Sequence, residues 1–135
     1  MNPELSQRNQ DIIQKALNRI KQSDGFSKIR FIALYGSVAT GEDTIHSDID
    51  IAISCKMDRF EAELYRMTLL SDLPEKIDLH IFENLPLYIR KSVLGGVFLY
   101  MQDEDEVYDL AYDTIREYNL FKPHLDDYTG ERFIA

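Results

Sequence analysis

Two aspartates, Asp48 and Asp50, open an apolar run in which they alternate with isoleucine. A β-strand has a period of two, so both carboxylates point to one face, while Ile49, Ile51 and Ile53 point to the other, toward a core. Two carboxylates about 7 Å apart along a strand repel each other unless a cation lies between them. The pattern favours Mg²⁺, which prefers hard oxygen ligands and leaves room for phosphate oxygens.

A third carboxylate, Asp78, lies in the alternating segment 76–81. If this segment pairs beside the strand of Asp48 and Asp50, the three carboxylates form one cluster. Asp78 then acts as a general base toward an incoming hydroxyl whose pKa a metal lowers, or as a plain metal ligand. His80 shares the face of Asp78 and so lies near this site; we interpret it as a structural histidine in preference to a ligand.

Gly36 and Ser37 follow the apolar run 29–35, with ten residues between them and Asp48. Glycine permits unusual dihedrals and close approach of a ligand to the backbone. Ser37 is expected to cap a short helix whose first N–H groups suit a phosphate, and its hydroxyl would add a contact to a β- or γ-phosphate. With two metal ions on the aspartates, this predicts a transfer site for a nucleoside triphosphate.

Competing interpretations of the same residues are weaker. His46, Ser47 and Asp48 are consecutive and form no hydrolase triad, so His46 is interpreted as a loop residue, with a nucleotide contact as the alternative. The segment after Asp48 lacks the later glycine and glutamate of a calcium-binding EF-hand loop. Cys55 is expected to be a buried filler at a strand end.

The spacing Gly36-Ser37, ten residues, Asp48-Ile49-Asp50, followed by Asp78 on a later strand, resembles the DNA polymerase β-like nucleotidyltransferase superfamily. The small size resembles its minimal nucleotidyltransferase (MNT) branch, which includes antitoxins of HEPN/MNT toxin–antitoxin pairs. The likeness covers roughly residues 28 to 102. One departure is that many relatives carry arginines directly after the Gly-Ser pair, where this chain has the segment 38–40, Val-Ala-Thr.

The resemblance implies a cytoplasmic adenylyltransferase that uses ATP and Mg²⁺, in two ions, to transfer AMP to a protein hydroxyl. It implies that the acceptor is a tyrosine of a partner HEPN ribonuclease toxin, with which the chain forms a hetero-oligomer and for which it is the antitoxin. Carried over, Gly36 and Ser37 hold phosphates, Asp48 and Asp50 hold metal, and Asp78 is the third carboxylate.

Two other functions stay open at this point. The chain is alternatively an antitoxin that blocks its toxin sterically without catalysis. It is alternatively a nucleotidyltransferase acting on a small molecule such as an aminoglycoside, although no second substrate domain is evident.

Composition limits these choices further. The 135 residues carry a net charge of −9, which argues against nucleic acid as a direct partner, because duplex binding depends on basic patches. No apolar run is long enough to span a membrane, and the start of the chain lacks the basic and apolar regions of a signal peptide. One cysteine excludes an internal disulfide and favours the cytoplasm.

The elements that must position these residues follow from hydrophobic spacing and from cap and breaker residues. Strands alternating with helices predict one α/β (α+β) domain over 1–135, with a small mixed sheet of about four strands flanked by helices. In the helix after Asp58, the residues Phe60, Leu64 and Met67 form a stripe. In the last helix, Tyr108, Tyr112, Tyr118 and Phe121 are interpreted as core first and as a partner surface second. The expected helices are 2–22, 37–41, 58–73, 84–95 and 104–120, with Pro123 ending the last, and the expected strands are 28–35, 48–54, 76–82 and 97–101.

Overall fold

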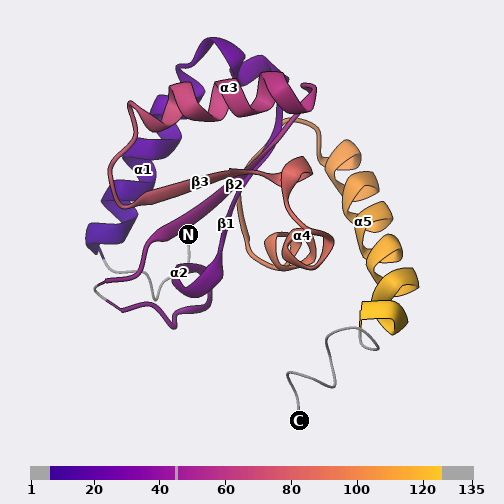
Figure 1. Cartoon of the computed structure of the whole chain (residues 1–135). Coiled ribbons are helices and arrows are strands. Elements are labelled where there is room, and N and C mark those ends of the chain that lie inside the picture. Colours follow the sequence, from indigo (N-terminus) through magenta and orange to yellow (C-terminus); the bar gives the residue numbers. More distant parts are fainter. Residues whose placement is uncertain (1–6, 45, 126–135) are drawn as a thin grey trace.

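A four-stranded mixed sheet lies at the centre of the computed structural model, which describes residues 7–44 and 46–125 (Figure 1). The strand order is β3-β2-β1-β4, in which β1 pairs antiparallel with β2 and β4, and β2 pairs parallel with β3. This confirms the predicted small mixed sheet, and it places the strands of Asp50 and Asp78 side by side. The strands are β1 (Ile29–Tyr35), β2 (Ile49–Cys55), β3 (Ile77–Ile81) and β4 (Val97–Met101).

Within residues 7–44 and 46–125, five α-helices pack around the sheet, close to the predicted ranges. The sequence did not predict the short 3-10 helices at Asp24–Lys28 and Phe82–Asn84. The predicted helix start at Asn2 and Pro3 lies outside the described residues. Across the described residues, no helix has the length and apolar character needed to cross a bilayer. The helices are α1 (Gln7–Lys21), α2 (Gly36–Thr40), α3 (Arg59–Leu70), α4 (Leu87–Leu94) and α5 (Glu104–Leu125).

The larger hydrophobic core lies between one face of the sheet and the helices α1 and α3 (Figure 1). Ile49, Ile51 and Ile53 point into it and are fully buried, as their alternation with polar residues predicts. Ile13 and Ile20 of α1 fill the same core and are also fully buried. Burial of these aliphatic side chains is the main stabilising contribution on this face.

A smaller core covers only part of the opposite face. Phe31 and Ala33 of β1 pack there with Phe82, Val93 of α4 and Val107 of α5. The aromatic rings of Phe31 and Phe82 meet edge to face, with centroids 5.1 Å apart. Helices α4 and α5 contact β1 on this face, and the half-exposed side chains of Asp78 and His80 show that part of its β2–β3 side is accessible.

Helix α3 begins as predicted, since Asp58 caps it by accepting a hydrogen bond from the Glu61 N–H at 2.8 Å. Its predicted apolar stripe is exposed, however: Phe60, Leu64 and Met67 are 74%, 50% and 61% exposed. The inward face is formed by Ala62 and Leu69 together with half-buried neighbours. Helical spacing identifies side chains on one face, but it does not say which face another element covers.

Helix α5 corrects two predictions. Tyr108, Tyr112 and Phe121 are exposed, so their interpretation as a core stripe is wrong, whereas Tyr118 is half-buried. Among the side chains that the structure describes in this helix, those of Val107 and Thr114 are buried. The helix also runs through Pro123 to Leu125. A proline inside a helix removes one backbone hydrogen bond and crowds the carbonyl group four residues earlier, and the nineteen helical residues before Pro123 offset this cost.

Candidate functional site

The accessible part of the sheet carries a row of three polar residues from adjacent strands. Tyr35, at the end of β1, is paired with Asp50, near the start of β2, and Asp50 is paired with Asp78 in β3. Directly paired residues point to the same face of a sheet. The condition that the sequence analysis set for a carboxylate cluster, that the strands of Asp50 and Asp78 pair, is therefore met.

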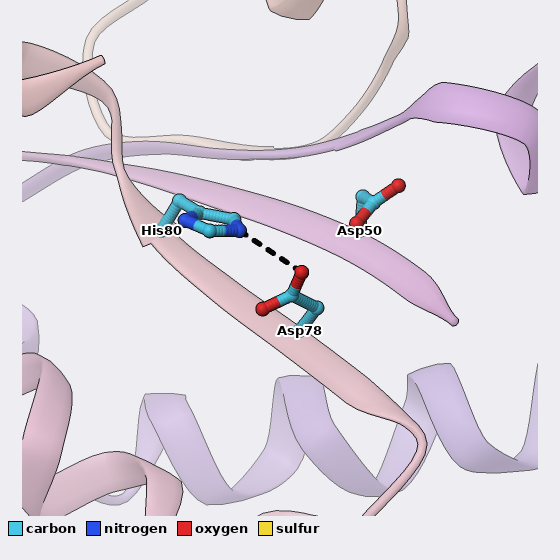
Figure 2. A group of neighbouring side chains, drawn as sticks. All are labelled: Asp50, Asp78 and His80. Carbon is cyan, nitrogen blue, oxygen red and sulfur yellow. Dashed lines mark ion pairs between the residues drawn. The ribbon is translucent and has the colours of Figure 1, made fainter.

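His80 joins the two aspartates in one cluster (Figure 2). It is paired with Ala52 in the parallel ladder, two residues along the strand from Asp78 and so on the same face. His80 Nε2 lies 3.0 Å from Asp78 Oδ2. One potential ligand atom from each of Asp50, Asp78 and His80 lies within 4.8 Å of the other two, so this arrangement can hold a divalent cation.

The electrostatics of the cluster favour a bound cation. Burial, followed by the charge of Asp78, raises the pKa of Asp50 above its ordinary value, and His80 acts in the opposite direction. Within residues 7–44 and 46–125, no lysine or arginine forms an ion pair with either carboxylate. A divalent ion would relieve the repulsion that raises this pKa.

Tyr35 lies beside the cluster, and the sequence analysis did not single it out. The residue is 9% exposed, and its ring centroid lies 6.5 Å from that of His80. Burial, followed by the charges of Asp50 and Asp78, raises the pKa of the Tyr35 hydroxyl. Tyr35 therefore stays neutral and forms an aromatic wall of the site.

Residue 36 has to be a glycine because of its backbone conformation and because the Asp50 carboxylate lies so close. Its φ is +75°, and a Cβ built there would lie 2.4 Å from Asp50 Oδ2. Helix α2 begins at Gly36 with Tyr35 as its N-cap residue, and no side chain caps it. The predicted capping role of Ser37 is therefore wrong, because the chain already turns at Gly36. Ser37 is half-buried in the first turn of α2, one residue from the contact with Asp50.

Asp48 lies outside the cluster of site residues in which the sequence analysis placed it. It immediately precedes β2, and its side chain is exposed. Its negative charge also raises the pKa of Asp50, by less than burial and the charge of Asp78 do. In the preceding loop, the Thr44 N–H donates to Ser47 Oγ at 2.9 Å, which shapes the approach to β2. Asp48 thus lies at the edge of the site, next to Asp50 and outside the three-residue cluster.

His46 and Cys55 lie outside the cluster of Asp50, Asp78 and His80. His46 is an exposed loop residue, in agreement with its primary interpretation. Cys55 is 2% exposed at the end of β2, as predicted, and burial raises the pKa of its thiol to about 12. Sequence reasoning placed His80 near the site without assigning it to the cluster, although the two-residue spacing from Asp78 contained that signal.

Comparison with known proteins agrees with this geometry. Residues 13–105 match the family described as polymerase beta, nucleotidyltransferase. A protein of Methanocaldococcus jannaschii, named as a protein adenylyltransferase, is 40% identical over 86 residues. The matched part covers 64% of this chain and 66% of that relative, so the chain spans just under two thirds of its length.

Solved structures share the fold at lower identity. A chain from the crystal structure of a toxin–antitoxin complex with AMP-PNP has a TM-score of 0.70 and 21% identity, over 89% of this chain and 97% of that one. A chain from a complex of tri-AMPylated Shewanella oneidensis HEPN toxin with MNT antitoxin has a TM-score of 0.63 and 22% identity, over 94% and 98%. With the family match covering most of the chain, the protein belongs to the polymerase β nucleotidyltransferase family.

Proposed function

We propose that the protein is a Mg²⁺-dependent adenylyltransferase that transfers AMP from ATP to a tyrosine hydroxyl of a partner HEPN ribonuclease toxin, and that it acts as the antitoxin in the cytoplasm. Family membership supports nucleotidyl transfer. The name of the M. jannaschii relative supports a protein acceptor, and the AMPylated toxin in a structure of the same fold supports the partner. The observation that carries the proposal is the pairing of Asp50 with Asp78 on an accessible sheet face.

In this proposal, Asp48, Asp50 and Asp78 hold the metal ions, and Gly36 and Ser37 hold the triphosphate. The donor set fits Mg²⁺ because two carboxylates converge, while half-exposure leaves room for water and phosphate oxygens. When bound, Mg²⁺ supplies positive charge that stabilises the attacking and leaving oxygens. The close contact between Gly36 and Asp50 brings the phosphate-binding turn next to the carboxylates.

The chemical step is an in-line displacement at the α-phosphorus of ATP. The tyrosine oxygen of the toxin forms a bond to this phosphorus, and the bond from the phosphorus to the bridging oxygen of the β-phosphate breaks. Pyrophosphate leaves with that electron pair. Asp78 accepts the proton of the attacking hydroxyl, while Tyr35 and the sheet shield one side of the site from water.

The test combines the purified protein, its HEPN toxin and ATP labelled at the α-phosphate, with Mg²⁺. Label should appear on the toxin with the wild type and be lost by at least about 100-fold with the Asp48→Asn/Asp50→Asn double variant. Asp11→Asn is the matched control, because Asp11 is an exposed residue of α1. Toxin bound and inhibited without any label would instead support a steric antitoxin.

A further inference from the structure

His80 stands apart from the oxygen ligands that Mg²⁺ prefers. Its Nε2 lies 3.0 Å from Asp78 Oδ2. One potential ligand atom from each of His80, Asp50 and Asp78 lies within 4.8 Å of the other two. Figure 2 shows the imidazole directed toward the Asp78 carboxylate, with Asp50 on the adjacent strand. The side chain of His80 is 36% exposed and that of Asp78 is 46% exposed, so an ion can enter from solvent.

The position of His80 is set by the fold. The parallel ladder pairs Ala52 with His80 two residues after it pairs Asp50 with Asp78, so His80 and Asp78 lie on the same face. The imidazole also lies against the ring of Tyr35, at an interplanar angle of 66°. Two strands and an aromatic neighbour therefore hold the nitrogen beside the carboxylates.

The contact between His80 and Asp78 brings a nitrogen and an oxygen to the spacing of two neighbouring ligands of one cation. Two adjacent ligands that each lie about 2.1 Å from a cation are about 3.0 Å apart. His80 Nε2 and Asp78 Oδ2 form an ion pair at this distance, 3.0 Å.

We propose that His80 is a nitrogen ligand of this site, and that it makes the site prefer a first-row transition cation such as Mn²⁺ over Mg²⁺. Imidazole is a softer donor than carboxylate, and the affinity of mixed nitrogen and oxygen sites rises from Mn²⁺ toward Cu²⁺. Mg²⁺ gains little from a nitrogen ligand and keeps water in its place. The inference rests on the proposed function only in treating the cluster as a metal site.

The experiment measures metal binding without ATP or toxin. Mn²⁺ is added to the wild type, to His80→Gln and to His46→Gln, which is the control because His46 is an exposed loop histidine. Calorimetry gives the Mn²⁺ and Mg²⁺ affinities, and electron spin-echo spectroscopy of bound Mn²⁺ detects coupling to a ligand nitrogen. Circular dichroism and thermal unfolding verify that each variant folds.

The expected result is nitrogen coupling in the wild type and in His46→Gln, and its loss in His80→Gln. The ratio of Mn²⁺ to Mg²⁺ affinity should also fall about tenfold in His80→Gln. Bound Mn²⁺ without nitrogen coupling, or an unchanged ratio, would overturn the inference. If the toxin is nevertheless labelled in the presence of Mg²⁺, the proposed function still stands. If the protein neither binds metal nor labels the toxin, both the inference about His80 and the proposed function are wrong.

Discussion

The turn at Gly36 and the carboxylate of Asp50 are in direct contact: a Cβ on residue 36 would lie 2.4 Å from Asp50 Oδ2. The residue that starts α2 therefore also determines where a carboxylate of the cluster can lie. A phosphate held at the turn and a cation held by the carboxylate would be neighbours for the same reason.

Gly36→Ala should damage both stability and the site. The left-handed φ of +75° costs a residue with a Cβ about 1–2 kcal/mol, and the new methyl group displaces the Asp50 carboxylate. Gly41→Ala is the matched control, because Gly41 also has a positive φ, +79°. Thermal unfolding should show a loss in both variants, whereas metal affinity should fall at least about tenfold only in Gly36→Ala. Equal metal affinity in the two variants would contradict the importance of this contact.

Asp50→Asn should stabilise the metal-free protein in a pH-dependent way. The pKa of Asp50 is raised in the folded state, so between its ordinary and raised values the folded protein holds more protons than the unfolded chain. Stability then falls as the pH rises through this window. In EDTA, the difference in Tm between the variant and the wild type should grow as the pH rises above the ordinary pKa of an aspartate carboxyl, about 3.9. Saturating Mg²⁺ should reduce or reverse this difference, and a pH-independent difference would refute the explanation.

The two adjacent glycines before β4 should respond oppositely to alanine. A Cβ on Gly96 would lie 2.2 Å from the Leu34 carbonyl oxygen, which is fixed in the central strand, whereas a Cβ on Gly95 meets only ordinary contacts from 3.6 Å. Gly96→Ala should cost about 2 kcal/mol or more, and Gly95→Ala should be neutral or stabilising by up to about 1 kcal/mol. Urea unfolding measures both, and similar effects would show that β1 and β4 can separate without cost.

The exposed aromatic side of α5 should contribute little to folding. Tyr112 is 66% exposed and Val107 is 3% exposed, although both lie on the same helix. Tyr112→Ser should change the free energy of unfolding by less than about 1 kcal/mol, whereas Val107→Ala should lower it by about 1–3 kcal/mol. A large loss with Tyr112→Ser would restore the original interpretation of this residue as core.

The strands and the faces on which Asp50 and Asp78 lie could be predicted because both depend on local alternation, whereas the pairing of the two strands was only a condition of the prediction, because it depends on the topology of the sheet. Ile49, Ile51 and Ile53 assign one face of β2 to the core, so Asp50 must lie on the other. The face of each helix that another element covers could not be predicted in the same way. Phe60 of α3 and Tyr112 of α5 have core-like spacing, yet no described element covers them, because coverage depends on tertiary packing.

In the candidate site, too, some features could be predicted from the sequence and others could not. The spacing of Asp48 and Asp50 indicated the metal chemistry, but the exposed position of Asp48 depends on where β2 begins. The place of Ser37 depends on the turn at Gly36, which starts α2 one residue early. The distance from His80 to Asp78 depends on side-chain orientation, which a period of two leaves undetermined.

Most of the apolar burial that stabilises the protein lies on one face of the sheet, and the candidate site lies on the other. The larger core lies against α1 and α3, whereas Asp50, Asp78 and His80 lie on the opposite face. Residues around the accessible face can therefore vary with little effect on the larger core, and the fold persists at 21% identity in a solved structure. Substitution libraries aimed at the candidate site should vary that face and leave the isoleucines of β2 unchanged.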